Sequence, residues 1–524
     1  MLSPGVPWAR GPCPARLRGP VVSGNIYPVA MLLHRARLLD LHTGVPGSPC
    51  DIMIRGDRVE SVHPLGGETV GEPDIEVIDL AGRLVIPGLW DQHVHAGQWA
   101  LASRRLKVSQ TARPEEILAE IAAQLDAIAD SDGDGIIQGF GLRASRWPAN
   151  PSAADLDAVT GRRPVAIVSA DLHSTWCNTA ALERLGMSDR PGFLTEADSF
   201  TAQIRLAQVS PRTLDRWLDE CCRAAAARGV VGIRDMEFSS STDLWLARQA
   251  AGRCPMWVQV AVYPARLQEA SGRHLATGQS AAAGSMVEMG PLKIIVDGSI
   301  SSRSAWCRKP YQGAVGPQRN GVDSIPPEEL ESLMTRARAA GLRPAVHAIG
   351  NLAVHTVLDA FARTGAAGTL EHAQLVDDAD LPRFAELGVA ASIQPAHLVD
   401  DRDTTDVVWA DQPHLSFRYR DLLDAGARLL MGSDAPVSPV DPWLAIRVAV
   451  ERTADRRPGW HLDQAITLSE ALLASTGGVS AVRPGGRADL VALDVDPFTT
   501  HGEELGSTLA TLTIAGGLIS HSML

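Results

Sequence analysis

The stretch 84–97, LVIPGLWDQHVHAG, holds a short apolar run that ends in two histidines one residue apart. Side chains at positions i and i+2 of a strand point to the same face, so His93 and His95 can converge on one ion. Imidazole is the usual nitrogen ligand of zinc in proteins. Two histidines that are merely hydrogen-bonded within the fold would give the same pattern. Whether the pair binds a metal is therefore decided by the residues that end the other strands.

Seven further apolar runs follow the first, and helical patterns separate them. The helical segments 213–229, 327–341 and 380–388 carry acidic residues near their starts and end at glycine, as helices commonly do. This alternation indicates an α/β protein with a parallel sheet, and eight units predict a (β/α)8 TIM-like barrel with its chemistry at the C-terminal strand ends. The predicted barrel strands are 84–90, 229–235, 257–263, 292–297, 343–348, 367–372, 389–394 and 428–433.

The two ends of the chain differ from its middle. Residues 31–84 and 485–524 contain short strand patterns with glycine turns, which predicts a small β-sandwich domain built from both chain ends. Residues 85–484 are the predicted barrel, and within them 97–212 is a long insertion that we interpret as a lid or substrate-binding element. Residues 1–30 contain six prolines and no acidic residue. We expect either a disordered extension or an upstream start codon, with true initiation at Met31.

Length and charge exclude several classes of protein. The chain has 524 residues, a net charge of −13 and seven cysteines. No broad basic field is available for nucleic acid, and no apolar run is long enough to span a membrane. An odd, scattered set of cysteines does not indicate a disulfide framework. The expectation is therefore a cytoplasmic enzyme that acts on a small molecule.

Polar side chains end several of the other predicted strands. His347 ends the fifth strand, His372 ends the sixth, and Asp434 follows the eighth. Because the C-terminal ends of barrel strands surround one cavity, these residues together with His93 and His95 predict a shared metal site.

Lys293 lies among apolar residues of the fourth predicted strand. Burial of its charge is unfavourable unless the side chain is paired or modified. Pairing with Asp297 or another carboxylate is one interpretation. The other is carbamylation by carbon dioxide, because the neutral amine reacts and the product is an anionic group able to bridge two metal ions.

The order His-x-His, Lys, His, His, Asp on such a barrel resembles the amidohydrolase superfamily, in particular its group that includes N-substituted formamide deformylase and uncharacterised metal-dependent hydrolases. The resemblance runs from about residue 31 to the C-terminus and includes the insertion. It is carried by VIPGLWDQHVH (85–95), DLHSTWCNTAAL (171–182), GPLKIIVDGSISSRSA (290–305), AVHAIGNLAV (345–354), EHAQLV (371–376), SIQPAH (392–397), MGSDAPVSPVDPW (431–443), LSEALLAST (468–476) and GGRADLVALDVDP (485–497).

The resemblance implies a centre of two divalent ions, with zinc as the expected metal. His93, His95 and Asp434 would hold one ion, His347 and His372 the other, and carbamylated Lys293 would bridge them. A metal-bound hydroxide would attack an amide-type C–N bond, as in an N-substituted formamide or an N-acyl amine, with Asp434 as general base and then general acid. A homodimer is a family-level expectation.

Other residues are candidates for substrate contacts, although each also has a purely structural interpretation. A packed tryptophan in a polar hairpin and an arginine that ties down a loop are the simplest of these. The candidates are Asp171, His173, Trp176, Asp297, Arg303, Gln394 and His397.

The chain also departs from the resemblance. Relatives usually carry Asp where this chain has Asn351 and Arg where it has Thr369, and the segment between 476 and 485 is short. A mononuclear deaminase of the same superfamily is one alternative, but its proton-shuttling glutamate would stand at Gly350. A non-catalytic scaffold is another, but it predicts lost ligands, and all the expected ligands are present.

Overall fold

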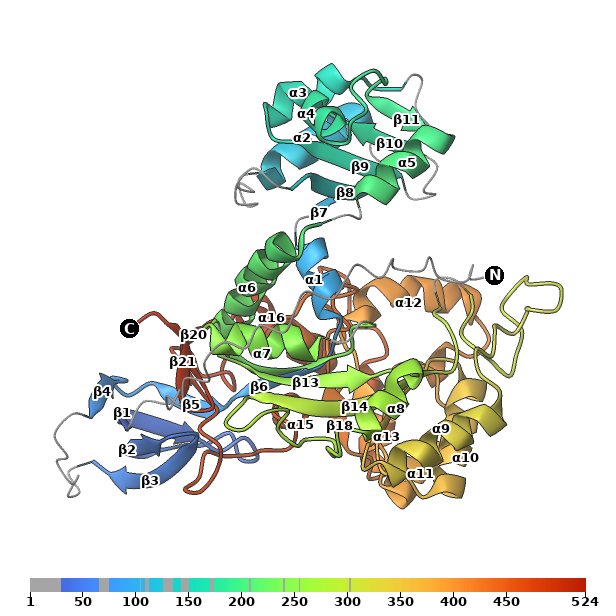
Figure 1. The fold of residues 1–524 in the computed structure, drawn as a ribbon. Coiled ribbons are helices and arrows are strands. Elements are labelled where there is room, and N and C mark those ends of the chain that lie inside the picture. Colours follow the sequence, from blue (N-terminus) through green and yellow to red (C-terminus); the bar gives the residue numbers. More distant parts are fainter. Residues whose placement is uncertain are drawn as a thin grey trace.

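The computed structural model shows a barrel, a β-domain made from both chain ends and a separate insertion body (Figure 1). Among the described residues, no helix is both long and apolar enough to cross a lipid bilayer. The structure describes residues 30–65, 75–103, 105–108, 113–125, 135–142, 150–169, 174–206, 209–238, 241–253, 255–300 and 303–524.

The barrel is a parallel sheet of eight strands, each paired with its neighbours in chain order. Its first and last strands meet through a bridge between Val94 and Ala435, and the backbone N–H of Asp434 donates to the carbonyl of His93 at 2.7 Å. The predicted eight-stranded barrel is therefore confirmed. Its strands are β6 (Leu89–Val94), β12 (Val230–Asp235), β13 (Trp257–Val262), β14 (Val287–Ile295), β15 (Pro344–Ala348), β16 (Thr369–His372), β17 (Ala390–Ile393) and β18 (Leu429–Met431).

Amphipathic helices cover the barrel. In α10 (Asn351–Thr364) the buried residues Val354, Val357, Leu358 and Phe361 recur at three- and four-residue spacing, so one face packs on the sheet. The helix ends at Gly365, whose φ of 58° forms a left-handed cap. The other helices of this part are α6 (Pro211–Ala227), α7 (Thr242–Ala250), α8 (Leu267–Ser271), α9 (Pro327–Ala339), α11 (Leu381–Leu387), α12 (His397–Val408), α13 (Tyr419–Asp424), α14 (Pro442–Glu451), α15 (Leu468–Ser475) and α16 (Gly502–Gly506).

The chain ends meet in one sheet, because β5 pairs antiparallel with β19. The order is β21-β20-β19-β5-β1-β2-β3, and β4 pairs with β1 beside this path. The domain built from both chain ends is thus one hydrogen-bonded sheet that branches at β1. Its strands are β1 (Met31–Leu39), β2 (Pro46–Arg55), β3 (Arg58–Pro64), β4 (Glu76–Asp79), β5 (Leu84–Pro87), β19 (Leu490–Leu493), β20 (Ala510–Ala515) and β21 (Leu518–Ser522).

The predicted strand 84–90 is two strands in the structure. β5 belongs to the end domain, and the barrel begins only at Leu89. Pro87 has no N–H for a sheet ladder, and a Cβ on Gly88 would lie 2.4 Å from the side chain of Val231. The Pro-Gly pair therefore ends one sheet and starts the next.

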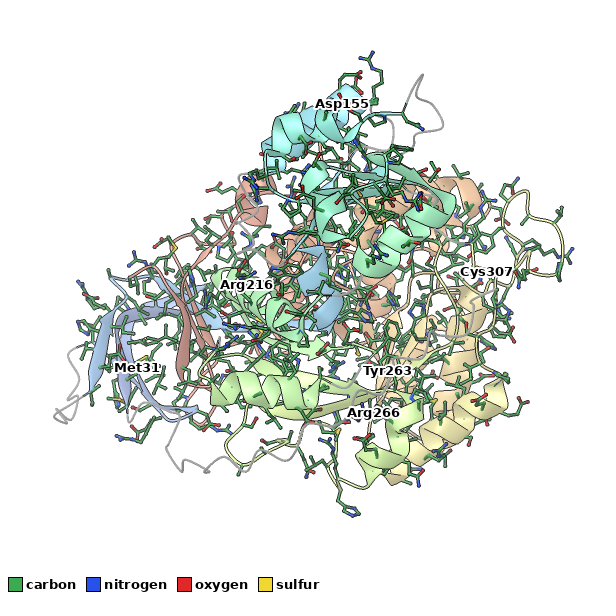
Figure 2. All side chains as sticks on the ribbon, turned by 45° about the horizontal axis from the view of Figure 1, so that its top comes forward. Met31, Asp155, Arg216, Tyr263, Arg266 and Cys307 are labelled. Carbon is green, nitrogen blue, oxygen red and sulfur yellow. The ribbon has the colours of Figure 1, made fainter. Side chains whose placement is uncertain are left out.

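The insertion has a hydrophobic core of its own, which includes Ile117, Ile121, Leu156, Ile167 and Trp176. It forms a five-stranded sheet of order β11-β10-β9-β8-β7, and it lies above the barrel in Figure 1, joined to it beside α1 and α6. In Figure 2, Asp155 marks this body and Tyr263 marks the barrel. The helix that leads into the insertion body, α1 (Ala96–Ala102), packs with α6 on the barrel. The elements of the insertion body are β7 (Arg105–Lys107), α2 (Pro114–Leu125), β8 (Ile137–Leu142), α3 (Ala153–Thr160), β9 (Val165–Ser169), β10 (Ser174–Cys177), α4 (Thr179–Arg184), β11 (Phe193–Thr195) and α5 (Glu196–Leu206).

Candidate metal centre

Four histidines gather at the C-terminal ends of three barrel strands. His93 lies near the end of β6, and its ring centroid is 5.7 Å from that of His95 and 5.3 Å from that of His372. The rings of His347, on β15, and His372, on β16, are 4.4 Å apart and meet edge to face. The strand ends thus bring together the four imidazoles that the sequence predicts.

Asp434 joins this group from the loop after β18. Its Oδ1 lies 3.5 Å from Nε2 of His93 and 3.3 Å from Nε2 of His95, and its Oδ2 lies 4.0 Å from Nε2 of His397. The φ angles of Asp434 and His372 are 55° and 73°, a left-handed conformation that is costly for such residues. Strain of this kind is retained where the position of a side chain matters.

The donor atoms fit a divalent metal ion. Two sets share Asp434, one with His93 and His95 and one with His372 and His397, and the ligand atoms of each set lie within 4.8 Å of one another. Among the described residues, the buried atoms Nδ1 of His95, Nδ1 of His372 and Nε2 of His397 have no hydrogen-bond partner. Buried polar nitrogens are normally satisfied, and an ion held by the second set would satisfy the nitrogens of His372 and His397.

Burial keeps three of these histidines neutral. It lowers the pKa of His347 to about 3, with the charge of Lys293 as a second cause, and it also lowers the pKa of His93 and His372. Only the neutral imidazole has a free lone pair, so burial prepares these side chains for metal binding. Although burial raises the pKa of Asp434, its contacts with His93 and His95 hold that pKa well below the usual range. Asp434 is therefore an anion at neutral pH.

Lys293 lies inside the barrel, and its side chain is only 1% exposed. Nζ is 2.9 Å from Nε2 of His93. Burial lowers the pKa of Lys293, while the charges of Glu371 and Asp434 act in the opposite direction. Among the described residues, no carboxylate forms an ion pair with this amine, and this includes Asp297. The pairing of Lys293 with Asp297 that the sequence allowed is therefore absent.

Glu371 is a site residue that the sequence pattern did not single out. It is fully buried, and its Oε2 accepts a hydrogen bond from Nδ1 of His93 at 2.9 Å. Burial by itself raises the pKa of Glu371, but this hydrogen bond and the charges of His93, Lys293 and Arg234 outweigh it and lower the pKa to about 2. Because the carboxylate can only accept, the proton of His93 stays on Nδ1 and Nε2 faces the site as a lone pair.

The comparisons with known proteins identify the family. A family model described as "Amidohydrolase family" matches residues 76–521. The chain belongs to the amidohydrolase family. It is accordingly a hydrolase that acts on carbon–nitrogen bonds.

Several relatives match this amidohydrolase over almost their whole length. YtcJ of Bacillus subtilis (strain 168), which is named as an amidohydrolase, is 27% identical, over 89% of this chain and 97% of its own. N-substituted formamide deformylase of Arthrobacter pascens is 27% identical, over 90% of this chain and 94% of its own. An uncharacterised metal-dependent hydrolase from Pyrococcus horikoshii OT3 has the same fold, with a TM-score of 0.72 and 24% identity over 91% of this chain and 99% of its own.

Asp297 holds the loops around the site together. Its carboxylate accepts backbone N–H bonds from Trp306 at 2.9 Å, Ile349 at 3.0 Å and Gly350 at 2.8 Å, and it lies 3.5 Å from Nε2 of His347. Burial raises the pKa of Asp297 to about 7, and these N–H groups act in the opposite direction. Its contacts are therefore those of a residue that positions the loop after β15.

The other predicted substrate contacts lie in different environments. Gln394 and His397 are buried beside the metal ligands, whereas Arg303 is exposed. Trp176 is fully buried in the insertion core, and its Nε1 donates to the carbonyl of Ser152 at 2.8 Å. Trp176 is therefore the packed tryptophan that the sequence allowed as the alternative to a substrate contact. Asp171 and His173 lie outside the described residues.

Asn351 and Thr369, the two residues that differ from the family pattern, both form side-chain hydrogen bonds. Asn351 donates from Nδ2 to Asp377 at 2.7 Å and accepts the N–H of Arg308 at 2.9 Å. The hydroxyl of Thr369 donates to Oε1 of Glu371, the oxygen that His93 leaves free. Both residues therefore support the loops and carboxylates around the metal ligands.

Proposed function

We propose that this amidohydrolase hydrolyses the C–N bond of a small amide, an N-substituted formamide or an N-acyl amine, at a centre of two zinc ions. The observation that carries the proposal is that one carboxylate, Asp434, is shared by two sets of potential metal ligands. A shared ligand between two sets is what a binuclear hydrolytic site requires.

In this proposal His93, His95 and Asp434 hold one ion. His372 and His347, whose rings lie 4.4 Å apart, hold the second, and His397, which forms a ligand set with His372 and Asp434, contributes to it or contacts the substrate. Lys293, if carbamylated, would supply a further anionic ligand to both ions, and its burial beside His93 supports this role. When bound, the ions polarise the substrate carbonyl and activate water at neutral pH.

Asp434 moves the proton. Its depressed pKa keeps the carboxylate ionised, so its free oxygen can accept a proton from the attacking water. The same oxygen then donates the proton to the departing amine nitrogen, which leaves as a neutral molecule. Glu371 takes no proton in this scheme, because it is fixed as an acceptor for His93.

An aromatic wall beside the ligands favours an apolar substituent on the substrate. Phe238 is 55% exposed, and its ring stacks on that of His95 at a centroid distance of 5.4 Å. Tyr263 lies 5.1 Å behind it and is held by a hydrogen bond from its hydroxyl to the carbonyl of Met236. An exposed phenylalanine on a ligand ring is a ready contact for an alkyl or aryl group.

The deaminase alternative meets a steric obstacle. A Cβ at position 350 would lie 2.1 Å from the carbonyl oxygen of Trp306 and 2.4 Å from its carbonyl carbon. This backbone is too close for any side chain, so the position where such deaminases carry a glutamate is closed in this fold.

The proposal is tested by hydrolysis of a panel of N-substituted formamides and N-acyl amines, with release of the amine as the readout. Asp434→Asn keeps the shape of the side chain and removes its basicity, so we expect a loss of about 10²- to 10⁴-fold in kcat. Asp411→Asn, at an exposed partner of Lys309, is the matched control and keeps full activity. Undiminished turnover in Asp434→Asn, or release of ammonia from amino-heterocycles in place of amide hydrolysis, contradicts the proposal.

A further inference from the structure

A second cavity, of about 510 Å³, opens at the end of the barrel opposite to the metal centre. Arg343 and Arg428 stand directly before β15 and β18, and Gly88 stands directly before β6, so the cavity lies at the N-terminal strand ends. The metal ligands lie at the C-terminal ends of the same strands. The volume is within the usual range for a small-molecule site, about 300–1,000 Å³.

The lining of this cavity is strongly basic. Five arginines line it, with Asp489 as the one carboxylate among the described lining residues. Arg487 forms ion pairs with Asp489 at 3.2 Å and with Glu288 at 3.6 Å, so these two carboxylates neutralise Arg487 and not the other arginines. The five arginines are Arg234, Arg343, Arg428, Arg483 and Arg487.

Three of these guanidinium groups lack a counter-ion. In the described part of the chain, no carboxylate forms an ion pair with Arg234, Arg343 or Arg428, and Nε of Arg234 donates only to the neutral Oε1 of Gln259, at 3.2 Å. Burial lowers the pKa of Arg234, and the charges of Arg428 and Arg343 lower it further, while Glu371 acts in the opposite direction. The three cations therefore lie close enough to repel one another.

Arg343 and Arg428 are exposed and solvated, so the three cations make a positively charged surface that attracts an anion. Guanidinium forks match the oxygens of phosphate in pairs of parallel hydrogen bonds. Trp90 and Leu430 add an apolar wall to the same cavity, and Gln92 and Thr476 add neutral polar groups. A small molecule with one phosphate group and a short organic part would satisfy both kinds of surface.

We propose that this cavity is a binding site for phosphate or a small phosphate ester, held by Arg234, Arg343 and Arg428. The site opens away from the metal centre, because Arg343 and Arg428 stand directly before β15 and β18, whereas Arg234 lines the same cavity from near the C-terminal end of β12. Its occupation would also place an anion beside Arg234, the cation that faces Glu371 and, through it, His93.

The test is calorimetric titration of the metal-loaded protein with inorganic phosphate at constant ionic strength. Wild type, Arg343→Gln/Arg428→Gln and a control, Arg212→Gln, are compared; Arg212 is exposed on α6 and does not line the cavity. Both cavity arginines are also exposed, so the double variant is expected to fold, and circular dichroism checks this. Loss of two charge-assisted hydrogen bonds weakens phosphate binding by at least about tenfold in the double variant. Arg212→Gln binds like wild type.

Phosphate can also bind at the metal centre, and the double variant separates the two sites, since binding there persists in it. The proposal is supported if wild type shows a saturable phosphate site that is absent from the double variant. Equal binding of phosphate by wild type and double variant overturns it, as does a preference for succinate over both phosphate and glycerol 3-phosphate. Tighter binding of glycerol 3-phosphate than of inorganic phosphate assigns the site to an ester, and the reverse order assigns it to the free ion.

Discussion

Replacement of Glu371 by glutamine tests how the barrel prepares His93 for metal. The two side chains have the same shape, so the substitution keeps a hydrogen-bond acceptor 2.9 Å from Nδ1 of His93 but removes its charge. A hydrogen bond to a charged group contributes about 1.5–3 kcal/mol and a neutral one about 1 kcal/mol. The difference, about 0.5–2 kcal/mol, corresponds to a loss of roughly 2- to 30-fold in zinc affinity, around the lower end of the range for such supporting residues.

The assay is a competition titration of zinc against a fluorescent chelator at fixed pH. Glu288→Gln is the matched control, because Glu288 is also a buried barrel glutamate and accepts a hydrogen bond from Gln259 at 2.9 Å, but it lies at the other end of the barrel. We expect weaker zinc binding in Glu371→Gln alone. If both variants bind zinc as tightly as wild type, Glu371 does not orient His93 and the reasoning fails.

Three further predictions concern stability. Burial raises the pKa of Cys177 to about 12, so above its ordinary pKa of 9.0 only the unfolded thiol ionises, and stability falls by about 1.4 kcal/mol per pH unit up to about pH 12. Urea unfolding at pH 8 and pH 10 should show this loss in wild type and less of it in Cys177→Ala; equal losses would contradict it. Trp176→Ala should cost about 3–5 kcal/mol by opening a cavity in the insertion core, whereas a tryptophan that served only the substrate would change KM without changing urea unfolding. Arg228→Gln should cost about 2–3 kcal/mol, because Arg228 bonds Asp441 and the carbonyl of Thr508 at 2.7 Å, and Arg266→Gln, at an exposed pair with Glu269, should cost less than about 0.5 kcal/mol. Similar melting temperatures for these two arginine variants would refute the assigned role of Arg228.

Strand periodicity predicted the barrel because each strand carries its own local pattern. His93, His95, His347, His372 and Asp434 were readable for the same reason, since each stands at or just after a strand end. The position of a residue along its own strand is a local property, and the barrel converts it into a shared position in space.

The parts that sequence reasoning missed depend on contacts between distant segments. Glu371 meets His93 across 278 residues, and its only local signal is that it directly precedes a ligand. The boundary at Pro87-Gly88 depends on the close approach of Val231 from another strand. Within the insertion the run 163–173 indicates a strand, which the structure has as β9, but β7 and β11 have three residues each and are too short for a periodic pattern.

The measurement that tests the central claim most directly is the zinc content of purified wild type and Lys293→Ala, determined in parallel by mass spectrometry of the metal. A carbamylated lysine that bridges two ions predicts about two zinc ions per wild-type chain and about one or none in the variant, together with loss of amide hydrolysis. About one ion per chain in both proteins, with hydrolysis retained in Lys293→Ala, would contradict the bridged centre.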